Sequence, residues 1–321
     1  MTERDKAHRL GPDAAHIAVV IVTFNSAEVL DGCLRSLTSQ TGVQLPVVVV
    51  ADNDSKDECL AIAEARTDLA IRTVRLGRNA GYAAAINAGI ATLDLRKLDA
   101  VFVMNPDCRL RPDTLQRLAK TLRQPGRGIA VPRLLNPGGS LQPSLRRSPA
   151  VGRALTEAIL GGNLAGRIGS LGELVISPRA YEHPGQAVWA TGAAMLLSAD
   201  AVRELGPWDE SFLLYSEETE YCLRANDRGW TVWYEPAAVV EHIGGESGTN
   251  PTLYALMVAN KVLLFRRRRG VPAGFAYYLA VVLGEAVRAL TGRRTSRASL
   301  VALLDPSGRR ALITSIAGSV R

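Results

Sequence analysis

The chain has 321 residues, of which 47% are hydrophobic, 21% charged and 5% aromatic, and its net charge is +7. This balance fits a globular fold and excludes a disordered chain, and so few aromatic residues leave little material for stacking on nucleic-acid bases. The four cysteines contain no CxxC pair, which argues against a zinc site and for reduced thiols.

The first half of the chain predicts strands that alternate with helices. Residues 1–15 are polar without an apolar stretch, so we expect a disordered N-terminal tail without a signal peptide. Apolar runs then predict strands, and apolar residues at helical spacing predict helices. The expected strands are 17–23, 47–51, 71–76 and 100–104, and the expected helices are 27–39, 57–66, 82–93 and 112–122. This alternation indicates the α/β class, with a mostly parallel central sheet covered on both faces.

The second half changes in texture. Residues 124–186 are rich in Pro, Gly, Ser and Arg, with one apolar stretch at 154–164, and they predict an irregular, partly mobile insertion. Regular structure is expected again at 187–198, and residues 253–290 have a mostly helical pattern.

Four consecutive arginines, Arg266 to Arg269, precede the apolar segment 273–284. The segment is shorter than the roughly 20 residues of a membrane-spanning helix. Basic residues beside an apolar helix are typical of a helix that lies on an anionic membrane. The alternative is packing on the core or on another subunit of a homo-oligomer.

Polar motifs follow three of the expected strands: Thr23-Phe24-Asn25, the stretch Asp52 to Asp57, and Asn105-Pro106-Asp107. Such strand ends form the ligand-binding edge of an open α/β sheet. Asp107 is a hard oxygen ligand suited to Mg²⁺ or Mn²⁺, and Asp52 can accept hydrogen bonds from a nucleobase or a ribose. The alternatives are a solvated Asp-Pro turn and helix caps at Asn25, Ser26, Ser55 and Asp57.

A fourth motif lies before the helix 82–93. Gly81 allows close backbone approach, and the following helix N-terminus favours an anion. Arg78 can pair with a phosphate. An ordinary strand-to-helix turn is the alternative.

These motifs occur together, in this order, in the inverting glycosyltransferases of family 2, which the chain resembles over about residues 16–265. Within that family it looks most like the bacterial rhamnosyltransferases of cell-wall and polysaccharide assembly. The matching segments are Thr23-Phe24-Asn25, Asp52-Asn53-Asp54-Ser55-Lys56-Asp57, Asn79-Ala80-Gly81-Tyr82, Asn87-Ala88-Gly89, Asn105-Pro106-Asp107, Thr191 to Met195, and Gly206 to Arg224.

The resemblance implies a GT-A fold, that of the nucleotide-diphospho-sugar transferases, over residues 16–250. The nucleotide-sugar-binding half would be 16–123 and the acceptor-binding half 187–250, with the insertion 124–186 between them. Residues 251–321 would form a helical C-terminal region that contacts the membrane or another subunit.

The resemblance also implies roles for single residues. Asp52 would meet the uracil or thymine ring, Asp107 and His242 would hold the metal, and Glu218 would be the catalytic base. The family pattern has Glu-Asp where this chain has Glu217-Glu218, so Glu217 is a second candidate. The other donor-binding candidates are Thr23, Phe24, Asn25, Asn53, Arg78, Asn79, Gly81, Tyr82, Asn87 and Asn105, and the acceptor-binding candidates are Trp189, Thr191, Gly192 and Arg224.

The reaction implied is transfer of a sugar, L-rhamnose from dTDP-L-rhamnose, to a lipid-linked or cell-envelope glycan. Inversion needs one displacement and one base, assisted by Mg²⁺ or Mn²⁺. The expected location is the cytoplasm, at the inner face of the plasma membrane. Two alternatives are a transferase for another donor, such as a UDP-sugar or a galactofuranose donor, and a non-catalytic nucleotide-sugar-binding protein.

Overall fold

The computed structural model describes residues 14–244, 249–305 and 307–318. The expected N-terminal tail therefore lies almost wholly outside the described residues. Its last member, Ala15, is buried and already belongs to the first strand.

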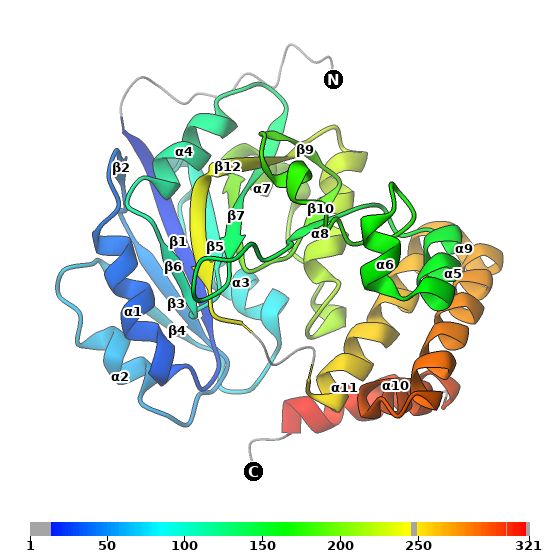
Figure 1. Ribbon diagram of the computed structural model, residues 1–321. Helices are drawn as coiled ribbons and strands as arrows, with labels where there is room; N and C mark the ends of the chain where they lie inside the picture. The colour runs from blue at the N-terminus through cyan, green and yellow to red at the C-terminus, as the bar shows by residue number, and fades with distance from the viewer. Residues whose placement is uncertain (1–13, 245–248, 306, 319–321) are drawn as a thin grey trace.

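A mostly parallel sheet forms the centre of the molecule (Figure 1). Its strand order is β4-β3-β1-β5-β11-β7-β12-β6, with β2 beside β1 and β9 beside β12. Strand β11 runs antiparallel to both of its neighbours, as β6 and β9 do to β12. The strands are β1 (Ala15–Thr23), β2 (Val43–Gln44), β3 (Val48–Asp52), β4 (Ile71–Arg75), β5 (Ala100–Met104), β6 (Cys108–Leu110), β7 (Arg127–Leu135), β9 (Gly185–Ala187), β11 (Ala194–Ser198) and β12 (Thr231–His242).

Helices cover both faces of this sheet, as the continuously apolar strands predict. Along β1, Val19 and Ile21 pack in a core with α1 and α4, whereas Val20 and Val22 pack in a core with α3 and α8. The period of two in a strand sends neighbouring residues to opposite faces, so both faces must be apolar. The covering helices are α1 (Ala27–Thr38), α2 (Cys59–Glu64), α3 (Tyr82–Ala91), α4 (Thr114–Leu122), α7 (Ala199–Leu205) and α8 (Glu217–Asp227).

The expectation of an irregular segment throughout 124–186 is wrong for β7, which lies inside the sheet between β11 and β12. Pro132 disguises this strand in the sequence, because proline lacks the N–H of a sheet ladder. The partner strand accommodates it: β12 changes register between Glu235, opposite Pro132, and Val239. The rest of the segment forms the short strand β8 (Leu145–Arg146), which pairs with β10 (Trp189–Ala190), and the helices α5 (Val151–Leu160) and α6 (Gly162–Arg167).

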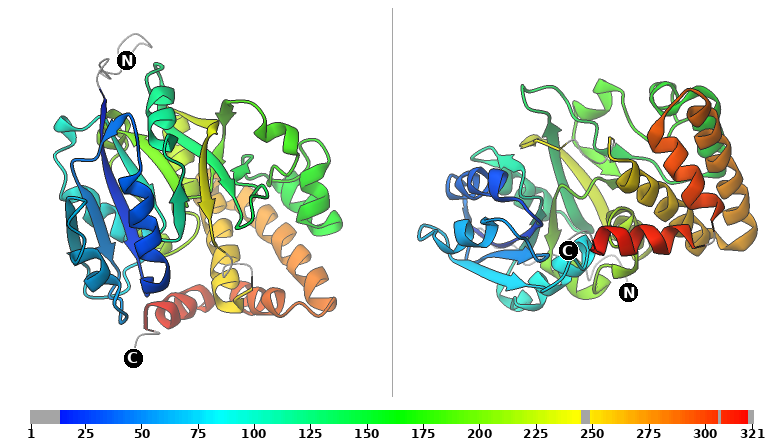
Figure 2. Two further views of the ribbon diagram at one scale, coloured as in Figure 1. Left: turned by 60° about the vertical axis from the view of Figure 1, so that its left-hand side comes forward. Right: turned by 90° about the horizontal axis from the view of Figure 1, so that it is seen from below.

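The C-terminal region is helical, as expected, and comprises α9 (Pro251–Leu290), α10 (Arg294–Leu304) and α11 (Gly308–Gly318). Figure 2 shows α9 and α10 on the side of the molecule away from β4 and α2, whereas α11 runs back toward the middle of the molecule. Helix α9 is kinked at Gly270, where φ is 79°. By length and composition alone α9 could cross a membrane, a property shared by core helices of soluble proteins. Part of it is such a core, since Tyr277 and Val281 are buried against α5.

Candidate active site

The loops after β1 and β3 meet at one edge of the sheet because the two strands are parallel and in register, with Thr23 opposite Asp52. The Thr23 hydroxyl donates to Oδ1 of Asp52 at 2.9 Å. Ser55 donates to the same carboxylate through its backbone N–H at 2.9 Å and its hydroxyl. Asp52 is only 1% exposed. A carboxylate has about four acceptor positions, so three bonds leave about one for a ligand.

The asparagines of these motifs join the loops to one another. Asn25, with φ of 49°, accepts the Lys56 N–H at 2.8 Å. Asn53 accepts the Ala80 N–H at 3.1 Å and donates to the Gly81 carbonyl at 3.3 Å. Both side chains therefore shape the edge of the sheet. Phe24 is half-buried in the same loop.

Gly81 lies where the donor-side loop touches the second half of the chain. Its φ is 97°, and a Cβ there would lie 2.2 Å from the Leu213 carbonyl oxygen. That oxygen accepts the Tyr82 N–H at 2.8 Å. The Tyr82 hydroxyl in turn donates to the Gly192 carbonyl at 2.8 Å, which joins the predicted donor and acceptor segments. Arg78 is exposed and Asn79 half-buried on the outer part of the loop.

The side chains of two residues in the matching motifs form hydrogen bonds within the protein rather than facing the candidate site. Asn87 bonds the backbone of Trp208 in both directions, at 2.9 and 3.0 Å. Arg224 bonds Glu220 at 2.9 Å and the Leu205 and Pro207 carbonyls. The structure therefore does not bring these two side chains together with the other candidates, and ligand contacts for them stay predictions.

The pairing of β12 with β6 places His242 opposite Cys108 and so beside Asp107. The His242 Nε2 lies 3.4 Å from Oδ1 of Asp107 and 3.4 Å from Nδ2 of Asn105. The other ring nitrogen, Nδ1, lies 2.8 Å from Oε1 of Gln142, which fits an Nδ1–H donor and turns Nε2 toward Asp107. Asp107 and His242 together have the donor atoms of a divalent-cation site.

Ionisation at this site favours the Asp107 carboxylate. Burial raises its pKa, but the hydrogen bond and charge of His242 and the Gly244 N–H outweigh burial and hold the pKa below its ordinary value. Cys108 lies within 4.8 Å of both ligand atoms. Burial, followed by the charge of Asp107, raises the pKa of this thiol well above its ordinary value. A protonated thiol that donates to the Ala193 carbonyl is no ligand for a hard cation.

The two candidate bases begin α8 and follow a backbone of unusual shape. We define residues 211–216 as the α8 loop. Three of its non-glycine residues have positive φ: Leu213 at 65°, Tyr215 at 67° and Ser216 at 78°. Left-handed backbone costs roughly 1–2 kcal/mol at each such residue, so tertiary contacts must hold this loop.

Glu218 lies where the predicted donor and acceptor segments meet. Its Cβ is 3.2 Å from where a Cβ on Gly192 would be, and the Tyr82 ring is 3.5 Å from the same point. Its Oε2 is buried and accepts no hydrogen bond from any described residue. Burial raises the pKa of Glu218, opposed by backbone hydrogen bonds and by the charge of Arg146. The raised pKa brings this carboxylate closer to the range of an effective general base.

Glu217 has a different environment. It is 2% exposed, and its Oε2 also accepts no bond from the described residues. Burial, and then the charge of Glu218, raise its pKa well above the ordinary value. Like charges in one buried site do not both ionise readily, so we expect Glu217 to stay protonated beside an ionised Glu218.

Arg146 is a site residue that the sequence analysis missed. Its strand β8 pairs with β10, and its guanidinium lies 5.7 Å from the centre of the Trp189 ring. The Thr191 N–H donates to the carbonyl of Ser144, the residue before this strand, at 3.1 Å, so the predicted acceptor segment is bonded to the chain that carries Arg146. Arg146 and Gln142 belong to the segment predicted to be irregular, and no local motif distinguishes them.

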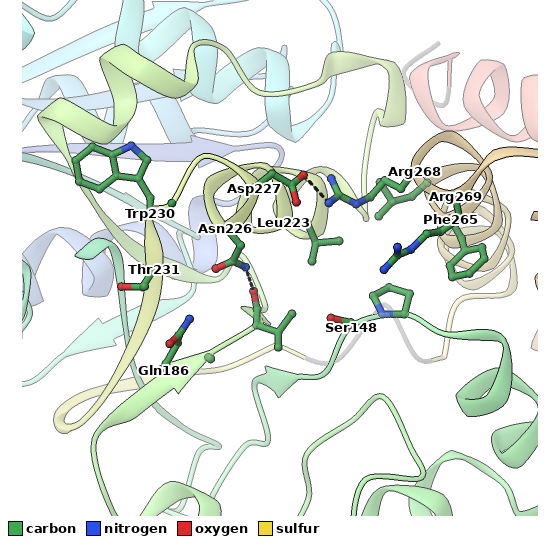
Figure 3. A pocket seen from close by; sticks show the side chains of 15 residues that line it. Ser148, Gln186, Leu223, Asn226, Asp227, Trp230, Thr231, Phe265, Arg268 and Arg269 are labelled. Atoms are coloured by element: carbon green, nitrogen blue, oxygen red, sulfur yellow. Dashed lines mark hydrogen bonds and ion pairs between the residues drawn. The ribbon is translucent and has the colours of Figure 1, made fainter. Parts of the chain in front are cut away.

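A separate cleft of about 670 Å³ lies at the other end of α8 (Figure 3). Asn226, Asp227, Arg268 and Arg269 line it, and Asp227 pairs with Arg268 at 2.6 Å. Asn226 is about 12 Å from Glu218 along the helix. No predicted site residue is among the described residues that line this cleft.

The fold and the site together define a glycosyltransferase of the GT-A fold. A mannosyltransferase from Pyrobaculum calidifontis, solved in complex with GDP-Man and Mn²⁺, superposes with a TM-score of 0.56 at 17% identity, over 99% of this chain and 90% of that one. Residues 18–172 match glycosyl transferase family 2. An N-acetylglucosaminyl-diphospho-decaprenol L-rhamnosyltransferase of Mycobacterium tuberculosis is 30% identical, over 73% of this chain and 78% of that protein. A low-salt glycan biosynthesis hexosyltransferase of Haloferax volcanii is 27% identical, over 65% and 61%. The chain belongs to glycosyl transferase family 2.

Proposed function

We propose that this glycosyltransferase transfers L-rhamnose from dTDP-L-rhamnose to a lipid-linked or cell-envelope glycan, with inversion and Glu218 as the base. The observation that carries the mechanism is the position of Glu218, whose Cβ lies beside Gly192 of the predicted acceptor segment, close to the Tyr82 ring, and whose Oε2 is buried without a hydrogen bond from the described residues. The donor and acceptor classes are supported by the rhamnosyltransferase relative and by Asn105-Pro106-Asp107.

In the proposed reaction the acceptor hydroxyl gives its proton to the Glu218 carboxylate as its oxygen attacks the anomeric carbon. The bond from that carbon to the nucleotide diphosphate breaks on the opposite face, which inverts the configuration. A positioned base contributes about 10²–10⁴-fold to such a step. The neutral Glu217 leaves Glu218 as the carboxylate that ionises first.

Asp107 and His242 would hold a divalent cation at this site. The carboxylate oxygen and the imidazole nitrogen fit Mn²⁺ better than Mg²⁺, which prefers an all-oxygen set. When bound, the cation neutralises the negative charge of the leaving diphosphate. Asn105 and Gln142 would orient the imidazole.

We also propose that the protein contacts the inner face of the plasma membrane through the second half of α9. Residues spaced four apart on one face of this helix are 43–62% exposed, although all are large and apolar: Val271, Phe275, Leu279, Leu283 and Val287. Helix α5 packs beside α9, where Ala158 lies against Gly284, and adds exposed Leu155 and Ile159. Exposed Arg266 and Arg269 complement an anionic lipid surface.

Vesicle co-sedimentation tests the membrane contact. Phe275→Glu is expected to weaken binding to phosphatidylglycerol vesicles, because the charge opposes burial in the acyl region. Ala61→Glu, which adds the same charge to the exposed side of α2, should bind like the parent. If the parent does not bind the vesicles but forms a dimer that Phe275→Glu dissociates, the exposed apolar residues of α9 form a subunit interface instead.

A panel of dTDP- and UDP-sugars, including a galactofuranose donor, tests the transfer proposal. Each is measured for Mn²⁺-dependent thermal stabilisation and then for turnover with a lipid-diphosphate sugar acceptor. A donor at about 100 times its Kd adds roughly 2.7 kcal/mol to the free energy of unfolding. Stabilisation and turnover by a UDP-sugar alone would replace dTDP-L-rhamnose as donor, and binding without turnover of any donor would favour a non-catalytic protein.

A further inference from the structure

The C-terminal helices form hydrogen bonds with the backbone of the α8 loop. Asn260 of α9 is fully buried, and its amide Nδ2 donates to three carbonyls of the loop region: Phe212 and Leu214, each at 2.8 Å, and Tyr215 at 3.2 Å. An amide has two N–H groups, so three acceptors require a shared bond and a fixed orientation.

Helix α11 fixes the orientation of this amide. Arg309 donates to Oδ1 of Asn260 and to the Ser211 carbonyl, both at 2.6 Å. Arg267 of α9 adds a bond to the Ser211 hydroxyl at 2.8 Å. We call Asn260, Arg267 and Arg309 the C-terminal clamp, which joins two helices to one strained loop.

The other side of the same loop faces the candidate active site. Leu213, between two residues bonded by Asn260, accepts the Tyr82 N–H and leaves space only for a glycine at position 81. Ser216 ends the loop and leads directly into Glu217 and Glu218. A displacement of the loop therefore moves both the donor segment and the carboxylates.

We propose that Asn260 is a positioning residue of the transferase. Its amide, oriented by Arg309, keeps Leu213, Tyr215 and Ser216 in their positive-φ conformation and thereby places Glu218 against Gly192. The clamp also couples the C-terminal helices to the reacting groups, so α9 is part of the catalytic framework. This inference rests on the proposed role of Glu218 as the base.

The test compares Asn260→Ala with Asn226→Ala. Asn226 also donates through its amide to a carbonyl, that of Val188 at 2.8 Å, but lies at the far end of α8. Misplacement of a reacting group by about 1 Å can cost about 100-fold, so we expect kcat of Asn260→Ala to fall about 10- to 100-fold. The Kd of the donor should rise by a smaller factor than kcat falls, because the loop contacts the donor segment through one backbone bond but leads directly into Glu218. Asn226→Ala should keep the parent kcat.

If Asn260→Ala fails to fold, Arg309→Ala in α11 is a second variant that tests the same contacts. It should also lower kcat, and Arg309→Lys, which keeps the charge but loses the planar fork of the guanidinium, should restore part of the activity. A kcat of Asn260→Ala or Arg309→Ala within about threefold of the parent, or an equal loss in Asn226→Ala, would overturn the proposal.

Amide hydrogen exchange separates this inference from the proposed function. Exchange at Leu213 to Glu218 should be faster in Asn260→Ala than in the parent or in Asn226→Ala, whether or not any donor is turned over. Unchanged exchange in these amides would refute the clamp even if the protein is an active transferase. Faster exchange in a protein without transfer would retain the clamp and reject the role of Glu218.

Discussion

The Nε2 of His242 lies 3.4 Å from Oδ1 of Asp107, although the two residues are 135 positions apart in the chain. The antiparallel pairing of β12 with β6 produces this contact, because it sets His242 opposite Cys108. Both side chains are largely buried, at 16% and 21% exposure. Because a carboxylate and an imidazole lie side by side here, the proposed divalent-cation site is the most directly testable part of the structure.

Asp107→Ala is expected to abolish metal-dependent binding of a nucleotide diphosphate. The carboxylate is held ionised in the folded protein, so its loss removes the charged ligand while His242 remains. Calorimetric titration with dTDP in Mn²⁺ and in EDTA measures the effect. Asp113→Ala, which removes a carboxylate paired with Arg117 on α4, is the matched control. Equal affinity of Asp107→Ala with and without Mn²⁺, at the parent level, would remove Asp107 from the metal site.

Glu218→Gln is expected to lower kcat by about 10²–10⁴-fold, the contribution of a positioned general base. The amide keeps the shape of the side chain, so dTDP binding should stay near the parent value. Single-turnover measurements on the loaded enzyme separate chemistry from product release. Transfer at the parent rate would move the base to Glu217 or elsewhere.

The pH dependence of transfer should reflect the environment of the Glu217–Glu218 pair. Burial raises the pKa of Glu218, so its basic form is lost, as the pH falls, at a pH above the ordinary Glu value of 4.5. Because Glu217 is expected to stay protonated while Glu218 ionises, Glu217→Gln should leave the acid limb of the kcat profile close to its position in the parent. A shift of the acid limb to lower pH in Glu217→Gln would show instead that Glu217 ionises before Glu218.

The raised pKa of Glu217 should also make the free energy of unfolding depend on pH, so that this residue destabilises the folded protein as the pH rises. A carboxyl whose folded pKa is raised stabilises the native state below its unfolded pKa and loses that contribution as the pH rises through the folded value. Glu217→Gln should therefore increase the free energy of unfolding relative to the parent at pH 8 more than at pH 4. Chemical denaturation at the two pH values measures the difference. A larger gain at pH 4 would mean that Glu217 is stabilised as an anion.

Periodicity in the sequence predicts the strands and helices around the ligand-binding edge because those elements bury continuous apolar runs. Strand β7 escapes prediction because Pro132 is tolerated only through a register change in β12, a property of the partner strand. The same limit applies to the site. The motif of Asp107 is local, but its contact with His242 depends on the register of β6. The bonds of Asn260 and the proximity of Arg146 to Glu218 depend on how distant elements pack. Motif residues such as Asn87 serve the scaffold, which local spacing does not distinguish from ligand binding.

Gly81 and Gly77 offer a matched pair for testing the contact between the two halves of the site. Both have positive φ, 97° and 69°, so alanine introduces backbone strain at either position. A Cβ at Gly77 meets nothing within 4 Å, whereas a Cβ at Gly81 would lie 2.2 Å from the Leu213 carbonyl. Gly77→Ala should therefore cost about 1 kcal/mol of unfolding free energy, the usual cost of alanine in this region.

Gly81→Ala should cost at least about 2 kcal/mol more, because the backbone of the α8 loop has to move. The movement would break the bond from the Tyr82 N–H to Leu213 and shift Glu218 away from Gly192, so kcat should fall as well. Urea denaturation and steady-state kinetics on the two variants give both quantities. Equal stability losses with unchanged kcat would show that the donor loop and the α8 loop are not mechanically joined. A selective loss in Gly81→Ala would show that glycine is required at position 81 by the approach of Leu213, in addition to its backbone conformation.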